Sequence, residues 1–173
     1  AGFLKWLHAE MQLHTAMNLH PADGVWPHEE MYPEFARRMG IDPTSARPIE
    51  FDIADPEFAR HYFEALHHPH EDQGVDFWWI DWQQGVKSGM AGLDPLWWLN
   101  HLHWWDMERR TEETKRRPIL FSRWGGLGGH RYQIGFSGDT FSNWSSLGFQ
   151  PFFTSTAGNV GYGYWSHDIG GHM

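Results

Sequence analysis

The sequence predicts an α/β fold in which parallel strands alternate with helices that pack outside them. Apolar and aromatic runs of strand length alternate along the chain with segments that carry helical periodicity or helix-start signals. Such an alternation implies parallel strands joined by right-handed crossovers. Several of the strand-like runs also end in a charged side chain, and the carboxyl ends of parallel strands are where α/β proteins do their chemistry.

The first quarter of the chain predicts a helix, a strand and a long excursion. Residues 3 to 11 place Phe3, Leu4, Leu7 and Met11 on one face of a short amphipathic helix. Residues 12 to 19 are compatible with a strand, and the proline and glycine at 20 to 24 end it. Residues 25 to 52 are interrupted by prolines, so we expect a long loop with one helical turn at 33 to 39. Long loops inside compact domains are usually functional.

The next segment predicts a helix followed by a buried strand. Asp55 and Pro56 supply an N-cap and a first-turn proline. Apolar side chains continue the helix to Leu66, and the histidine-rich stretch 67 to 70 is expected to end it. These histidines could bind a metal with the acids beside them, but a solvated helix terminus explains them more simply. An apolar run from Gly74 then leads to Asp81 and a polar turn closed by Gly85.

The second half of the chain repeats this order. Asp94 and Pro95 begin another helix, whose charged end at 108 to 117 is expected to be exposed. Its tryptophan pairs at 97–98 and 104–105 are expected to pack in the core. Further strands are predicted at 118 to 123, 133 to 137 and 164 to 168, with a helix around 142 to 149.

Composition narrows the class of ligand. The 173 residues include 12 Trp, 12 Phe and 5 Tyr, more rings than a core of this size normally uses, and such rings stack well on sugars. A net charge of -9 argues against binding to a nucleic-acid backbone. The absence of Cys excludes disulfides and thiolate metal sites. No apolar run approaches the ~18 residues of a membrane helix, so no membrane partner is expected, and the cytoplasm is slightly favoured.

The strand ends suggest glycoside cleavage. Asp81, Asp139 and Asp168 each end a strand-like run, and Arg123 ends another. Two carboxylates across an aromatic cleft can act as an ionised nucleophile and a protonated acid, while an arginine holds the nucleophile ionised or binds hydroxyls. We expect Trp79 and Trp82, which flank Asp81, to line this site. Asp81 could instead cap a turn, and aligned acids also occur in metal-dependent hydrolases.

Several motifs together resemble glycoside hydrolase family 31. They are the run from Gly74 to Asp81, Phe121-Ser-Arg123 followed by Ser137-Gly-Asp139, and Trp165-Ser-His-Asp168-Ile-Gly-Gly. The family contains retaining α-glucosidases and α-xylosidases built on a (β/α)8 TIM barrel. The resemblance implies an α-glycoside or oligosaccharide as substrate, with no cofactor and no metal.

The resemblance also implies roles for individual residues. Asp81 matches the catalytic nucleophile and Asp139 the general acid/base. The remaining matches line the subsite in which cleavage occurs, namely Arg123, Trp79, Phe136, Asp168 and His172. His172 stands where an aromatic Phe or Trp is common in the family, which puts a preference for glucose in doubt.

A complete barrel of this kind takes roughly 250 residues. The resemblance therefore implies one partial catalytic domain over residues 1 to 173, covering about strands 3 to 7 and incomplete at both ends. Open strand edges must be covered, so the remainder of the barrel or a second copy is the expected partner. A barrel fragment that is inactive and at most binds carbohydrate is the alternative.

Overall fold

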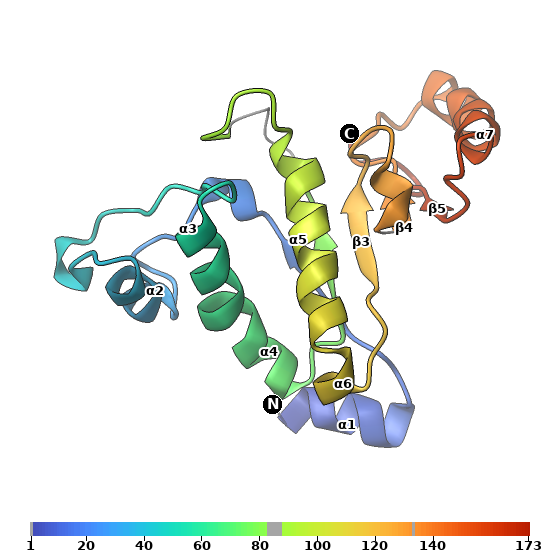
Figure 1. Cartoon of the computed structure of the whole chain (residues 1–173). Helices are drawn as coiled ribbons and strands as arrows, with labels where there is room; N and C mark the ends of the chain where they lie inside the picture. Colours follow the sequence, from blue (N-terminus) through green and yellow to red (C-terminus); the bar gives the residue numbers. More distant parts are fainter. Residues whose placement is uncertain (1, 83–87, 133) are drawn as a thin grey trace. The chain divides into compact units, whose positions relative to one another are not determined.

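The computed structural model describes residues 2–82, 88–132 and 134–173 (Figure 1). The chain forms two compact units, Ala1–Leu99 and Asn100–Met173. The first unit contains α1 (Gly2–Met11), β1 (Ala16–Leu19), η1 (Pro21–Asp23), α2 (Tyr32–Arg38), η2 (Pro43–Ser45), α3 (Pro56–His61), η3 (Tyr62–His67), α4 (His68–Gln73) and β2 (Phe77–Ile80). Helix α5 (Pro95–Arg109) follows, and then α6 (Thr111–Thr114), β3 (Leu120–Arg123), η4 (Gly129–Arg131), β4 (Ile134–Phe136), α7 (Trp144–Gly158) and β5 (Trp165–Ser166).

The strands are parallel, as predicted. In the first unit β1 pairs with β2, with Ala16 opposite Phe77 and Leu19 opposite Ile80. In the second unit β4 lies between β3 and β5 and is parallel to both. All five strands fall where the apolar runs of the sequence predicted them, and helices occupy the segments between them. The α/β prediction is therefore confirmed.

One face of β2 packs into the core of the first unit. Trp78 and Ile80 are 2% and 0% exposed. The indole of Trp78 lies with its centroid 4.5 Å from the ring of His67 and donates a hydrogen bond to Glu71 at 2.8 Å. Burial of two large apolar side chains on alternate positions fixes the register, because a slip by one residue would move them to the other face.

The helix that begins at Asp55 continues to Gln73, so the prediction that 67 to 70 end it was wrong. The segment Tyr62–His67 is a wider π-helical stretch, after which α4 carries Pro69 in its first turn. The wider turn accommodates a proline, which has no N–H and whose ring collides with the carbonyl four residues earlier in a regular α-helix. Gly74, at a φ of 119°, ends the helix.

His67 is not part of a solvated helix terminus. Its side chain is 2% exposed, and its Nδ1 donates to the carbonyl of Tyr62 at 2.9 Å. The sequence prediction failed here because the helix continues and packs on β2, which buries the side chain that a chain end would have exposed.

Two other predictions about helices need correction. Helix α7 runs to Gly158 rather than ending near residue 149, and it contains Pro151. Its N-cap is Asn143, whose side chain accepts the N–H of Ser146 at 2.9 Å. In α5, Trp105 is 48% exposed and so does not serve as a core residue within the described structure. Over the described ranges, every helix is too short or too polar to cross a bilayer.

A buried carboxylate holds α1. None of the residues of α1 is buried, and Phe3, which lies on the predicted apolar face, is 67% exposed. The link to the strands is Asp76, whose side chain is 8% exposed and lies 2.8 Å from Nε2 of His8. Asp76 also accepts the N–H of Thr15 at 2.7 Å. One carboxylate therefore joins α1 to the starts of β1 and β2.

Replacing Asp76 by Ala should lower the free energy of unfolding by about 2 to 3 kcal/mol, because it leaves the N–H of Thr15 without its acceptor in a part-buried site. Chemical denaturation of both proteins measures the change. Glu112→Gln is the control, since that side chain is 96% exposed and its pair with Lys115 contributes little. An Asp76→Ala loss no larger than that of the control would show that the carboxylate does not anchor α1.

Burial raises the pKa of Tyr62 well above its ordinary value. The folded state therefore keeps the phenol protonated at a pH where the unfolded chain, near pKa 10, releases the proton. Stability is fully present below pH ~10 and falls above it, by up to about 1.4 kcal/mol per pH unit for this group. Tyr62→Phe should flatten the dependence between pH 9 and 11 in denaturation curves, and parallel curves for the two proteins would contradict the assignment.

Candidate active site

Asp81 stands at the carboxyl end of β2, directly after the strand. It is 8% exposed, and its backbone N–H donates to the carbonyl of Leu19 at 2.9 Å, which continues the ladder one step past β2. Side chains alternate along a strand, so Asp81 lies on the same face as Trp79 and opposite to Trp78 and Ile80. The register places Asn18 beside Trp79. We call Asn18, His20, Trp79 and Asp81 the aspartate face.

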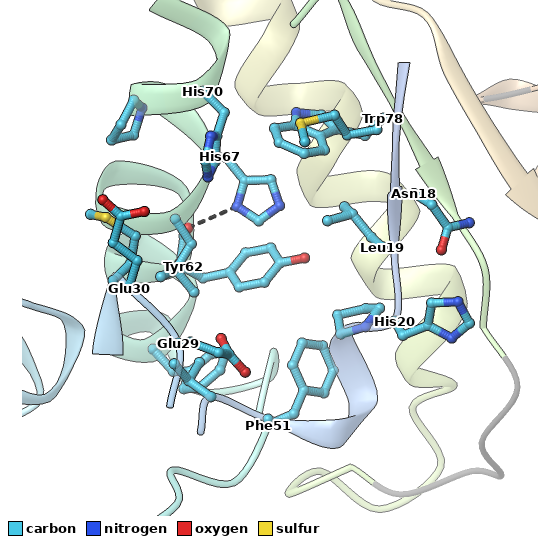
Figure 2. Close-up of a pocket in the computed structure, with 18 of the residues that line it drawn as sticks. Asn18, Leu19, His20, Glu29, Glu30, Phe51, Tyr62, His67, His70 and Trp78 are labelled. Carbon is cyan, nitrogen blue, oxygen red and sulfur yellow. Dashed lines mark hydrogen bonds between the residues drawn. The ribbon is translucent and has the colours of Figure 1, made fainter. Parts of the chain in front are cut away.

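His20 follows β1 as Asp81 follows β2. Its Nε2 lies 3.5 Å from Oδ2 of Asp81, and the side chains are 42% and 12% exposed. Figure 2 shows Asn18 and His20 on the side of β1 opposite to Leu19, as strand alternation requires. The sequence contained a signal for this residue, because His20 ends a predicted strand, but only the register shows which carboxylate it meets.

Strand β1 also lines a cavity of about 500 Å³ in the same unit. Figure 2 shows Leu19, Phe51, Tyr62 and His67 around it. This cavity lies between β1 and the helical segment from Pro56 to Gln73. Asn18 and His20 also belong to its lining, whereas Asp81 does not. The cavity is therefore not the space in which Asp81 would meet a ligand.

The tryptophans beside Asp81 differ in their surroundings. Trp79 is half-buried on the aspartate face. Trp82, also half-buried, packs on Phe51, with ring centroids 5.7 Å apart. Phe51 comes from the end of the long excursion, so that loop supports a predicted site residue, and Phe51 itself was not predicted. The polar turn at 83 to 85 lies outside the described residues.

In the second unit, Arg123 and Phe136 end neighbouring strands and are directly opposite each other in register. The guanidinium carbon of Arg123 lies 5.6 Å from the centroid of the Phe136 ring. Its Nη2 lies 2.9 Å from Oδ1 of Asp139. The exposed fractions of the two paired side chains are 13% and 28%, so this is a charge-assisted pair shielded from most of the solvent. From the sequence we expected an arginine to hold the nucleophile ionised or to bind hydroxyls, and its pairing with Asp139 was not predicted.

Gly138 allows the arginine to approach. Its φ is +73°, and a Cβ built at this position would collide with Nη1 of Arg123. A residue with a side chain is disfavoured here both by the backbone conformation and by the guanidinium. The Ser-Gly-Asp sequence thus lets the Arg123 guanidinium lie over the turn that presents Asp139.

The last residues of the chain bring His172 to the same carboxylate. The N–H of His172 donates to the carbonyl of Thr140 at 2.8 Å, and its Nδ1 lies 3.9 Å from Oδ1 of Asp139. Asp168 is half-buried and is held through its backbone N–H, which donates to Ser137 Oγ at 3.0 Å. The structure thus brings together Arg123, Phe136, Asp139, Asp168 and His172 at the carboxyl ends of β3, β4 and β5.

Two hollows adjoin these residues. One, of about 670 Å³, is lined by Asp139 and by a set of aromatic side chains, namely Trp124, Phe141, Phe149, Phe153 and Trp165. The other, of about 650 Å³, has Asp168 and Trp144 in its wall. Spaces of this size hold small organic ligands, and aromatic walls beside a carboxylate suit a sugar ring.

A comparison with protein families matches the whole chain, residues 1–173, to the glycosyl hydrolases family 31 TIM-barrel domain. The chain belongs to glycosyl hydrolase family 31. Its five parallel strands are part of that barrel domain, so the predicted family and the predicted TIM-barrel class are both confirmed.

Solved structures agree with the family 31 fold. The cycloalternan-degrading enzyme from Trueperella pyogenes, in complex with cycloalternan, matches with a TM-score of 0.71 and 17% identity. A mutant of Kfla1895 in complex with isomaltose matches with a TM-score of 0.67 at 17% identity, and one in complex with cyclobis-(1->6)-alpha-nigerosyl with 0.61 at 18%. Each match covers 99% of this chain and 27% of the other, so the chain spans about a quarter of their length.

Gly138→Ala tests the approach of Arg123 to Asp139. The positive φ alone should cost about 1 to 2 kcal/mol, and displacement of the guanidinium adds to it. Gly148→Ala is the matched control, because a methyl group there meets no atom within 4 Å. In the middle of α7 it should stabilise the protein by about 0.5 to 1 kcal/mol. Equal effects of the two substitutions in denaturation experiments would contradict the close packing at Gly138.

Proposed function

We propose that this chain is the catalytic core of a retaining α-glycoside hydrolase, with Asp81 as nucleophile and Asp139 as general acid/base. The observation that carries the proposal is that each aspartate follows a strand of a family 31 barrel and has a cationic or titratable partner. Asp81 lies 3.5 Å from His20, and Asp139 lies 2.9 Å from Arg123.

In the first step, a carboxylate oxygen of Asp81 attacks the anomeric carbon and forms a C–O bond with it. The bond from that carbon to the glycosidic oxygen breaks, and Asp139 gives its proton to this oxygen, so the leaving group departs as an alcohol. Substrate binding must let Asp139 carry that proton while it lies beside Arg123. The proposal includes Arg123 donating hydrogen bonds to sugar hydroxyls in the complex, which would weaken its hold on Asp139.

In the second step, Asp139 acts as a base. Its carboxylate takes a proton from water, the water oxygen bonds to the anomeric carbon, and the ester bond to Asp81 breaks. The pair between Arg123 and Asp139 corresponds to the ionised form of Asp139 that this step requires. The double displacement requires carboxyl groups about 5 to 5.5 Å apart in the catalytically competent enzyme.

The substrate class is supported by the aromatic hollow at Asp139 and by the related structures, which contain cycloalternan, isomaltose and a cyclic nigerosyl saccharide. We propose an α-linked oligosaccharide as the ligand. Trp79 and Trp82 near Asp81, and Phe136, Asp168 and His172 near Asp139, would line the subsite of the sugar that is cleaved.

The open edge of β1 and the exposed aromatic side chains of α7 would be covered by further parts of the barrel. Within the described part of the first unit, β1 pairs only with β2, and Ala16, Met17 and Asn18 are exposed. In the second unit, α7 exposes Trp144 by 86% and Phe152 by 63%. Further strands and helices of the barrel, in the same polypeptide or a second copy, would cover such surfaces.

Hydrolysis of p-nitrophenyl α-glycosides, with native mass measured alongside, tests the function. Without an added nucleophile, Asp81→Ala should lose all hydrolysis, and Asp139→Ala should lower kcat by about 10² to 10⁴-fold. Azide separates the two roles. With Asp139→Ala it should give the α-glycosyl azide through the covalent intermediate, and with Asp81→Ala the inverted β-azide. Asp42→Ala, at an exposed turn, is the control and should keep wild-type activity.

Three outcomes would overturn parts of the proposal. A first-formed sugar with inverted configuration contradicts the retaining mechanism. Loss of activity on chelation favours a metal-dependent hydrolase. A folded wild-type chain without turnover shows that it is an incomplete barrel that at most binds carbohydrate.

A further inference from the structure

We infer that His20 positions the carboxylate of Asp81 for attack on the sugar, an inference that rests on the proposed role of Asp81 as nucleophile. The first observation is the register of β1 and β2. Leu19 is opposite Ile80, and the N–H of Asp81 donates to the carbonyl of Leu19 at 2.9 Å. The backbone ladder therefore places His20 and Asp81 side by side on the aspartate face.

The second observation is that His20 is held there by its own backbone and is not used for capping. It precedes Pro21 and occupies the N-cap position of η1, with φ −118° and ψ 66°, but its side chain makes no capping hydrogen bond. A residue before proline has restricted backbone freedom. The imidazole is thus presented from a constrained backbone and lies beside Asp81.

The third observation is the geometry of the contact. Nε2 of His20 lies 3.5 Å from Oδ2 of Asp81, and the carboxylate is the less exposed partner, 12% against 42%. A carboxylate nucleophile must direct one oxygen at the anomeric carbon, and a donor on the other oxygen fixes the plane of the group. The distance is slightly longer than a standard hydrogen bond, and such contacts tighten when substrate is bound.

His20 is a positioning residue, because it acts through Asp81 and does not bind the sugar. Loss of the imidazole should therefore slow formation of the covalent intermediate and leave substrate affinity nearly unchanged. A residue that contacts the sugar equally in the ground and transition states would instead raise KM.

The test compares His20→Ala and His20→Gln with wild type. The rate of covalent labelling of Asp81 by 5-fluoro-α-D-glucosyl fluoride, followed by intact mass and peptide mapping, reports nucleophile reactivity. His20→Ala should slow labelling and kcat by about 10 to 100-fold, with KM changed less than about threefold. His20→Gln keeps an N–H donor at a similar reach and should recover most of the loss.

His14→Ala is the matched control. Nδ1 of His14 lies 3.5 Å from Oδ1 of Asp76, the same separation as the His20 pair, but at the opposite ends of the same two strands. Its labelling rate should equal that of wild type. Three results would overturn the inference: labelling of His20→Ala at the wild-type rate, a raised KM at unchanged kcat, or no recovery with glutamine.

Failure of the proposed function can be distinguished from failure of the inference about His20. If wild type hydrolyses p-nitrophenyl α-glucoside but is not labelled at Asp81, the nucleophile assignment is wrong; if it does neither, the chain is not an active glucosidase. In both cases the contact is judged by a double-mutant cycle with His20→Ala and Asp81→Asn. Coupling that changes the unfolding equilibrium constant by more than about threefold supports the contact. Additive effects overturn it.

Discussion

The parallel pairing of the strands is the constraint on which the candidate site depends. In a parallel ladder, residues that follow neighbouring strands are brought to one edge, and their side chains share a face if the register is in phase. Burial of Trp78 and Ile80 on one face of β2 sets that phase in the first unit and leaves Trp79 and Asp81 on the other. The packing of apolar residues therefore decides on which face of β2 the proposed nucleophile, Asp81, lies.

The two proposed catalytic aspartates differ in their exposure and in the side chains that contact them. Asp81 is well shielded and is approached by an imidazole from the neighbouring strand end. Asp139 is more exposed and is paired with a guanidinium that lies over the ring of Phe136 and against Gly138. A nucleophile must stay ionised and correctly oriented, whereas an acid/base must exchange protons with the leaving group and water. The lower exposure of Asp81 and the greater exposure of Asp139 fit these two roles.

The two ends of the β1–β2 pair carry carboxylates with different proposed roles. Asp76 precedes β2 and ties α1 to the strands through His8 and Thr15, while Asp81 follows β2 on the aspartate face. In barrels the residues before the strands generally serve stability and those after them serve catalysis. A histidine–aspartate contact thus occurs at both ends of one strand pair, with a structural role at the start of the strands and a proposed catalytic role at their end.

By itself the sequence determined the class of the fold, the family, and the identity of the strand-end residues, because apolar runs, Asp-Pro helix starts and short motifs are local features. It also predicted that Asp81, Arg123, Asp139 and Asp168 end strands. Only the tertiary structure showed that His20 meets Asp81, that Arg123 and His172 approach Asp139, and that Phe51 supports Trp82. It also decided that the helix continues through His67, since packing on β2 outweighed the local helix-ending signal of Pro69. These contacts join residues far apart in the chain, and their partners depend on register and packing that no local pattern encodes.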